Sequence, residues 1–313
     1  MSVNLIWAAL AAAAALNGQA AQPAPAAQPA PSATPPASGS STEVDEVVVT
    51  GSRNQAEVIR NFVADVSAPV NGERQLARWD RTICPGVAGL QGRYAQVLLD
   101  RLAVAAYRVG LDVGEPGCRP NIMIFATRDG NVLAREIVEQ NPRLVSLYGD
   151  TGNTIGRARI RDFQSVPRAV RWWHVTRTFT TDGIAVDRGD QVQVRGSSRL
   201  RRNTRQDFDR VIIIVDVNQA QGVPFGALAD YIAMVSLAQL DATARVDGYD
   251  SVLTLFNERR EGRAGPAGLT GWDVSYLQGL YGAVREARNV QAQQDDVAAR
   301  MRESQNAEPT PPR

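Results

Sequence analysis

Two adjoining stretches of the chain decide its fold: RVIIIVDV at residues 210–217 and PFGALADYIAMVSLAQLD at residues 224–241. The first is a short apolar run rich in β-branched residues, which predicts a strand buried inside a sheet. The second spaces its apolar residues by three and four positions, which predicts a helix over residues 225–240. A buried strand that leads into an apolar helix is typical of a domain in which helices cover a sheet.

Helices and strands are predicted to alternate along the rest of the chain. Apolar spacing predicts helices at residues 55–66, 94–110 and 131–140, a short helix around 250–257, and a long helix from Thr270 past Ala287 towards DDVAARMRE. Strands are predicted at residues 121–127 and 169–179, and GIAVDRGDQVQVRG predicts a hairpin that turns at residues 188–190. We therefore expect one mixed α/β (α+β) domain over residues 54–290, with a mixed sheet and flanking helices. A helical extension and a polar tail are expected over residues 291–313.

The first 20 residues have the pattern of a secretory signal peptide. The apolar run LIWAALAAAAAL is too short for a comfortable membrane span, and the small residues Gly18 and Ala20 suit cleavage after Ala20. The residues before the run, MSVN, lack the usual basic residue. Residues 21–43 are rich in proline, alanine and serine, which predicts an extended linker. No later run is long enough to span a membrane, so we expect a periplasmic or secreted protein.

Charge composition excludes several classes of function. The chain has 34 basic and 33 acidic residues, and every basic residue is arginine. A net charge of +1 gives no basic surface for nucleic acid, so no nucleic-acid partner is expected. Because no lysine is present, Schiff-base and serine–lysine catalysis are excluded.

The only two cysteines are Cys84 and Cys118. In an exported chain, two cysteines most simply form one disulfide, which would contribute roughly 4 kcal/mol through loop closure. In a cytosolic chain, the alternative is a pair of buried free thiols.

The carboxy-terminal part of the chain carries a set of motifs. The helical stretch ADYIAMVSLAQ at residues 229–239 is followed by SVLTLFN at 251–257 and LTGWDVSYLQGLYG at 269–282. The matching residues of the last stretch are Leu269, Thr270, Asp273, Leu277, Leu280, Tyr281 and Gly282. This arrangement resembles the zinc metalloproteases of the matrixin and wider metzincin type. It is also similar to an uncharacterised group of secreted bacterial proteins predicted to be zinc proteases.

The resemblance implies a single zincin-like domain, but it places no zinc ligand in this chain. Such proteases carry His-Glu-x-x-His-x-x-Gly-x-x-His on the helix, because two imidazoles four residues apart share one face. Ala229 and Ala233 occupy the first two ligand positions, Asp230 the position of the general base, and Gln239 the third ligand position. Ser236 replaces the glycine. We therefore expect no metal and no cofactor. The alternative is a plain core helix followed by a helix capped by Thr270 and Asp273.

The stretch EVDEVVVTGSR at residues 43–53 resembles the TonB box of TonB-dependent outer-membrane receptors. The resemblance implies that residues 44–53 contact TonB or another envelope protein. Val47, Val48, Val49 and Thr50 would add as a strand to the partner's sheet. The alternative is the first strand of the chain's own domain. The chain lacks the series of alternating strands that builds a receptor barrel.

Two further stretches contain candidate functional side chains. His174, in WWHV, is more typical of a hydrogen-bonded core residue than of a general base, because no nucleophile motif accompanies it. The stretch RGSSRLRRNTRQDFDR contains a possible anion patch formed by Arg199, Arg201, Arg202 and Arg205. Its interleaved polar residues favour the alternative, a solvated surface loop.

Together these observations favour an exported bacterial envelope protein that acts as a non-catalytic, pseudo-metalloprotease binding or assembly module. One alternative is a hydrolase with a non-zinc mechanism that uses Asp230 or His174 in the same cleft. Another is a TonB-linked accessory protein that acts through its amino-terminal strand.

Overall fold

The computed structural model describes residues 43–69, 75–147, 153–187, 190 and 201–306. The chain divides into two units, Met1–Val44 and Asp45–Arg313, and the second unit contains the folded domain. The expected signal peptide lies outside the described residues, as does the expected linker apart from Glu43.

The second unit combines helices with one mixed sheet, which confirms the expected α+β fold class. The helices are α1 Glu43–Val66, α2 Gly92–Tyr107, α3 Gly130–Gln140, α4 Arg157–Ser165, α5 Phe225–Leu237, α6 Leu255–Arg260, α7 Gly271–Gly282 and α8 Val290–Asn306, with a 3-10 helix, η1, at Val252–Thr254. The strands are β1 Pro85–Ala88, β2 Ile122–Thr127, β3 Val170–Thr180, β4 Ala185–Val186 and β5 Thr204–Asp216.

The strands lie in the order β1-β2-β5-β3-β4. β1, β2 and β5 are parallel, whereas β3 is antiparallel to both β5 and β4. The apolar run that predicted a buried strand is the centre of β5, where every residue from Val211 to Val215 is buried. A strand in the middle of the sheet is covered on both faces, and this explains why its apolar residues do not alternate with polar ones.

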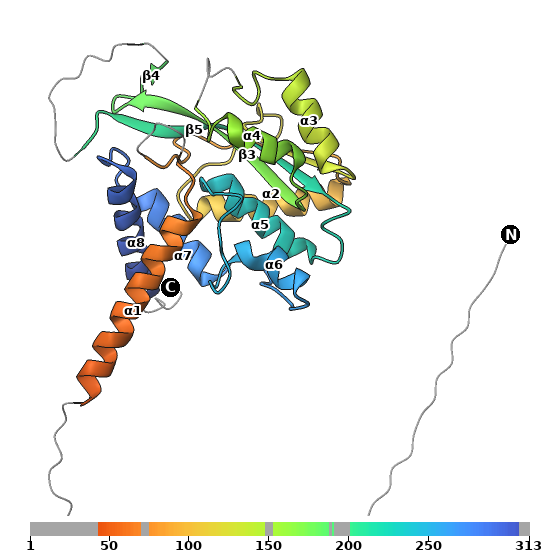
Figure 1. The fold of residues 1–313 in the computed structure, drawn as a ribbon. Helices are drawn as coiled ribbons and strands as arrows, with labels where there is room; N and C mark the ends of the chain where they lie inside the picture. Colours follow the sequence, from red (N-terminus) through yellow and green to blue (C-terminus); the bar gives the residue numbers. More distant parts are fainter. Residues whose placement is uncertain (1–42, 70–74, 148–152, 188–189, 191–200, 307–313) are drawn as a thin grey trace, which may run out of the picture. The chain divides into compact units, whose positions relative to one another are not determined.

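Each face of the sheet has its own hydrophobic core (Figure 1). The larger core brings α1, α2, α5, α7 and α8 together with sheet residues such as Ile124 and Ile213. The smaller core lies between α3, α4 and sheet residues such as Trp173 and Ile212. Ile212 and Ile213 belong to different cores because successive side chains of a strand point to opposite faces.

Cys84 and Cys118 form a disulfide, as expected for an exported chain. The bridge joins the residue before β1 to the loop that leads into β2. Asn121 reinforces this junction, because its side-chain oxygen accepts a hydrogen bond from the Cys84 N–H at 2.7 Å. Among the described residues, none of the helices has the length and apolar character needed to cross a membrane.

Residues 44–53 are helical, so the expectation that they form the first strand of the domain is wrong. A lone strand makes no backbone hydrogen bonds within itself, whereas each residue added to an existing helix gains one. The helix predicted at residues 55–66 therefore extends back to Glu43. Val47, Val48, Val49 and Thr50 would have to leave this helix before they could add to a partner's sheet.

The single long helix expected from Thr270 onwards is also wrong, because α7 ends at Gly282 and α8 begins at Val290. The guanidinium group of Arg78 donates hydrogen bonds to the carbonyl groups of Leu280, Tyr281 and Ala283, which satisfies the end of α7. The segment between the helices then pairs with residues 201–202 through backbone hydrogen bonding.

The hairpin expected to turn at residues 188–190 lies mostly outside the described residues. The hairpin that the structure describes joins β3 to β4 through residues 181–184. Gly183 has a positive φ of 82°, a conformation that glycine adopts without strain. The Ile184 N–H donates to the Thr180 hydroxyl oxygen at 3.0 Å and closes the turn.

Candidate functional site

The two alanines at the expected first ligand positions, Ala229 and Ala233, are fully buried in the larger core. They lie four residues apart on α5 and therefore share one helix face. Helix α2 packs closely against α5 near these alanines. The guanidinium group of Arg101 on α2 would lie 2.9 Å from a Cβ atom added to Gly226 of α5. The relation of this helix to zincins stays a prediction, but its alanine face is packed and lines none of the three cavities described.

Asp230, at the expected position of the general base, is held by structural contacts. Its Oδ2 atom lies 2.9 Å from Nη1 of Arg101 and accepts a hydrogen bond from the Leu269 N–H at 2.9 Å. These contacts connect α5 to α2 and to the segment before α7. Asp230 lines none of the three cavities that the structure describes.

Gln239, at the expected third ligand position, also joins backbone segments. Its side-chain oxygen accepts a hydrogen bond from the Ala77 N–H at 2.6 Å, and its backbone carbonyl accepts one from Ala68. Ser236 donates to the Ile232 carbonyl one turn earlier in α5. The expected metal-site positions are therefore parts of the packed interior.

His174 is buried in the larger-core face of β3 rather than placed in a cleft. Its Nε2 atom lies 2.8 Å from the Val235 carbonyl oxygen, so Nε2 carries the proton and donates. Burial lowers the pKa of His174 to about 4, and the hydrogen bond to Val235 only partly opposes this shift. The imidazole is therefore neutral and packs beside the ring of Phe208, with 5.0 Å between centroids.

The motif stretches at residues 251–257 and 269–282 meet at the buried carboxylate of Asp273. This carboxylate accepts hydrogen bonds from the Ser251 hydroxyl at 2.5 Å and from the Val252 N–H at 2.7 Å. It also completes a capping box with Thr270 at the start of α7, as the sequence predicts. The serine and aspartate of these motifs thus hold η1 against α7.

The possible anion patch is only partly described. Arg199 lies outside the described residues, and Arg201 and Arg202 precede β5, which includes Arg205. The Arg205 guanidinium donates to Asp80 at 2.5 Å and to Asp207 at 3.1 Å. Its charge is therefore neutralised within the domain, so Arg205 is a poor ligand for an external anion.

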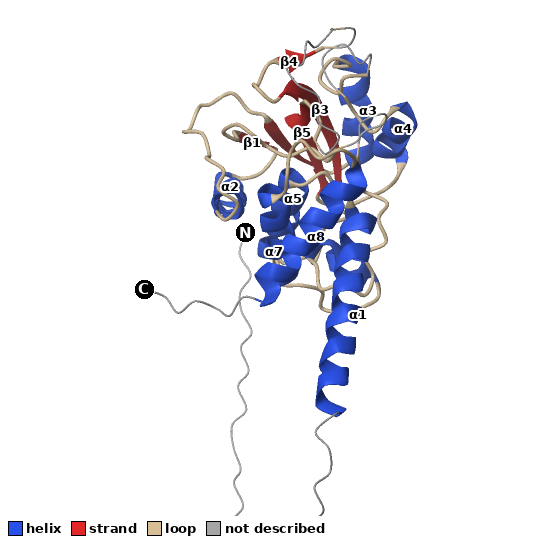
Figure 2. Ribbon diagram, turned by 90° about the vertical axis from the view of Figure 1, so that its left-hand side faces the viewer, coloured by secondary structure: helices blue, strands red, loops and turns tan. Residues whose placement is uncertain are grey.

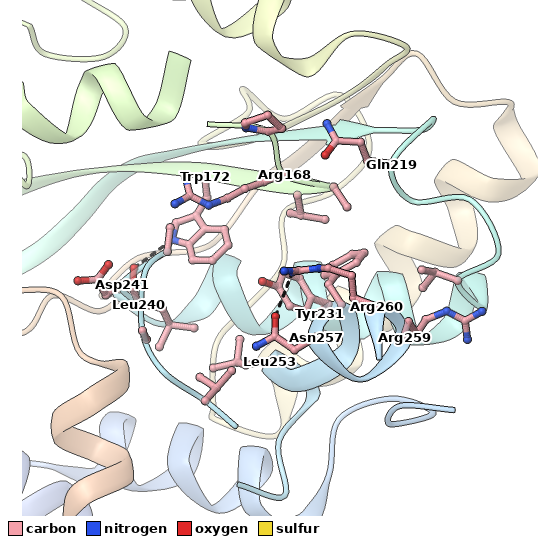
Figure 3. A pocket seen from close by; sticks show the side chains of 18 of the residues that line it. Arg168, Trp172, Gln219, Tyr231, Leu240, Asp241, Leu253, Asn257, Arg259 and Arg260 are labelled. Carbon is pink, nitrogen blue, oxygen red and sulfur yellow. Dashed lines mark hydrogen bonds between the residues drawn. The ribbon is translucent and has the colours of Figure 1, made fainter. Parts of the chain in front are cut away.

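A cavity of about 610 Å³ lies beside α5, at the start of β3 and next to α6 (Figure 3). Tyr231 enters it from α5. Since each helical residue turns by about 100°, Tyr231 points away from the face shared by Ala229 and Ala233. The cavity volume falls within the range of about 300–1,000 Å³ that is usual for small-molecule sites.

Aromatic side chains form the apolar part of this cavity. The Tyr231 ring packs edge-on against Phe256 at 5.0 Å and against Trp172 at 6.2 Å between centroids. The Trp172 indole N–H donates to the Leu240 carbonyl at 3.0 Å, which fixes its orientation. These contacts hold the aromatic side chains of α5, α6 and β3 in place, so the apolar surface of the cavity exists before any ligand binds.

The charged groups of the cavity are mainly cationic. Arg168, Arg259 and Arg260 line it, together with a single carboxylate, Asp241. That carboxylate is already paired with Arg159 at 2.9 Å, and Arg260 donates to Asn257 at 3.1 Å. The cavity therefore presents an excess of positive charge.

Arg168 and the Tyr231 hydroxyl have no hydrogen-bond or ion-pair partner among the described residues, unlike the other ionisable groups of the cavity discussed above. Burial raises the pKa of Tyr231 above its ordinary value, against a smaller opposing effect of the Arg168 charge. Tyr231 is therefore a neutral phenol that can donate a hydrogen bond. A half-buried guanidinium and a phenol hydroxyl near an apolar surface suit a ligand with a carboxylate and an apolar body.

The described part of the chain contains no group of three or more histidine, cysteine, aspartate or glutamate side chains arranged to hold a metal ion. No protein-family model matches the chain. No curated protein is similar to it. No solved structure matches its fold. The function is therefore inferred from the geometry of the cavity.

The expected zinc motif and the cavity share α5 but lie on opposite faces of it. Tyr231 lies within the expected zinc motif, and the helical period alone places it opposite the alanine face. Arg168 and Phe256 gave no sequence signal, because the fold brings them to the cavity from separate segments.

Proposed function

We propose that the protein is an exported envelope module that binds a small ligand with an apolar or aromatic body and one carboxylate, and does not convert it chemically. The observation that carries this proposal is the combination of the unpaired Arg168 guanidinium and the free Tyr231 hydroxyl in an aromatic cavity. We refer to this cavity as the carboxylate pocket; it is lined by Arg168, Trp172, Tyr231 and Phe256, among others.

The chemistry of the carboxylate pocket supports this ligand class. A guanidinium group presents several N–H donors and binds a carboxylate more tightly than a neutral amide of the same shape. The aromatic rings offer a large apolar area whose orientation is already fixed before the ligand arrives. A ligand with both features would use both parts of the pocket.

The contacts of the two candidate catalytic groups support a binding role over a hydrolytic one. Asp230 is paired with Arg101, and His174 donates to a backbone carbonyl inside the core. Neither residue lines the carboxylate pocket. A hydrolase that uses these two groups would first have to break contacts that hold α5 in place.

The disulfide supports a location in the periplasm or outside the cell, because such bridges persist in oxidising compartments. Contact with TonB or another envelope protein through residues 47–50 stays a prediction, because no contact of the described domain favours it.

The proposal is tested by calorimetric titration of the full exported chain with 4-phenylbutyrate and with 4-phenylbutyramide, which differ only in charge. We expect the acid to bind at least about tenfold more tightly than the amide, since only the acid pairs with Arg168. Tyr231→Phe should weaken acid binding by removing one donor, and Arg108→Gln, an exposed arginine on the end of α2, should not change it. Equal affinity for acid and amide, or binding that Tyr231→Phe leaves unchanged, would contradict the proposal.

A further inference from the structure

A second cavity, of about 810 Å³, lies along β1 and β2 on the face of the sheet that holds the smaller core. Met123 and Phe125 of β2 pack against that core and also line the cavity. Gly86 and Ala88 of β1 lie opposite them in the sheet register and therefore share this face. We call this cavity the β1 groove, and its floor is formed by these four residues.

The β1 groove is open because α3 and α4 cover only the other part of this face. Figure 2 shows β1 at the side of the sheet away from α3 and α4. On this face the ring of Pro120 packs over Gly86, so that a Cβ atom on Gly86 would lie 2.8 Å from it, whereas Ala88 has only a single methyl group. Together with the half-buried Met123 and Phe125, they leave a shallow apolar channel beside the end of the sheet.

The outer edge of β1 is free at Val87, whereas Ile83, which precedes β1 and faces the same edge, already pairs with residues 112–114. β1 is the terminal strand of the sheet and pairs with β2 alone over Pro85–Ala88, within the part of the chain that the structure describes. The Cys84 carbonyl accepts from the Ile122 N–H, so Cys84 points towards β2. Because backbone groups alternate in direction along a strand, Val87, three residues later, points its N–H and C=O away from β2.

Positive charge lies at one end of the β1 groove. Arg81, Arg119 and Arg210 line it together with one carboxylate, Asp209. Asp209 is shared, because it lies 2.7 Å from Arg210 and 3.6 Å from Arg81. Arg119 is exposed and has no ion-pair partner among the described residues. Three arginines and one shared aspartate leave this end of the groove with a net positive charge.

We propose that the β1 groove binds an extended acidic segment of a partner polypeptide, which adds as a strand to the edge of β1. Its backbone pairs with Val87, and apolar side chains on one of its faces fill the channel above Ala88 and beside Pro120. Its carboxylates pair with Arg119 and with the cluster of Arg81 and Arg210. This site lies on the face of the sheet opposite α5, so the proposal is independent of ligand binding in the carboxylate pocket.

The test measures binding by fluorescence anisotropy of a labelled ten-residue peptide whose first half is rich in glutamate and whose second half is rich in valine. The comparison peptides replace the glutamates with arginines, or carry N-methyl groups on alternate residues of the acidic peptide so that one edge cannot pair. We expect the acidic peptide to bind, the basic peptide to bind at least about tenfold more weakly, and N-methylation to cause a similar loss.

Protein variants locate the peptide. Arg119→Glu reverses an exposed, unpaired charge, and Ala88→Glu adds both bulk and negative charge to the floor at an exposed position. Each variant should weaken binding about fivefold or more, whereas Arg302→Glu, an exposed arginine on α8, should leave it unchanged. Circular dichroism of each variant checks that the fold is retained. The proposal is overturned if charge or N-methylation does not affect binding, or if Arg119→Glu and Arg302→Glu behave alike.

Discussion

The hydroxyl group of Ser251 donates a hydrogen bond to the carboxylate of Asp273, with 2.5 Å between the two oxygens. Both residues are buried, and they come from the two segments whose motifs predict a relation to zincin-type proteases. Whatever its ancestry, this pair has a structural role here. The buried carboxylate accepts hydrogen bonds from the start of η1 and from the start of α7, and so connects the two helices.

Replacement of Asp273 by alanine should destabilise the domain by about 3 kcal/mol. The substitution leaves the Val252 N–H and the Thr270 N–H without their acceptor, and removes the capping box of α7. The measurement is the free energy of unfolding in urea. Asp112→Ala removes an exposed carboxylate and serves as the control, with an expected change below about 0.5 kcal/mol. A similar small change for Asp273→Ala would refute the structural role.

His174 should remain neutral far below the pH at which an exposed histidine gains a proton. Because burial lowers its pKa to about 4, the unfolded chain binds a proton more readily than the folded chain between about pH 6.5 and pH 4. This residue therefore reduces stability as the pH falls through that window and has no such effect above it. Since it is the only histidine, its ring resonances in an NMR titration report it directly. Titration near pH 6.5 would contradict its burial.

Introducing histidine at Ala233 should strongly destabilise the protein instead of restoring a metal site. The position is fully buried, and a larger side chain there must displace packed neighbours at a cost of about 3 kcal/mol or more. Ala299→His, at a half-exposed position on α8, is the control and should change the melting temperature little. Equal melting temperatures for the two variants would mean that Ala233 faces open space.

Removal of the disulfide should lower stability by about 4 kcal/mol, because the bridge closes a loop between residues 34 positions apart. The measurement compares urea unfolding of the oxidised chain with that of the Cys84→Ser/Cys118→Ser double variant. The same loss should follow treatment of the native protein with a reducing agent. If neither change alters the unfolding midpoint, the bridge has no stabilising role.

The fold class could be predicted from the sequence because its main signals are local. The apolar run of β5, the helical spacing of α2 and α5, and the capping residues of α7 each depend on nearby positions. The break between α7 and α8 could not be predicted, since it depends on Arg78, which lies 202 residues from Leu280 in the chain. Likewise, the β-branched run at residues 47–49 is part of α1, because extension of that helix satisfies its backbone hydrogen bonding.

The candidate site could be predicted only in part. The sequence predicts the helix at residues 225–240, but the resemblance points to Ala229 and Ala233 and not to Tyr231 on the opposite face. Arg168, Trp172 and Phe256 meet Tyr231 through the packing of β3, α5 and α6, which no spacing along the chain reveals.

The most direct test of the carboxylate pocket compares two ligands with two proteins. The affinities of 4-phenylbutyrate and 4-phenylbutyramide are measured by calorimetry for the native chain and for Arg168→Gln. We predict that the native chain prefers the acid by about tenfold and that Arg168→Gln binds acid and amide almost equally, because the variant loses the charge but retains the aromatic surface. An unchanged preference for the acid in Arg168→Gln would contradict the account.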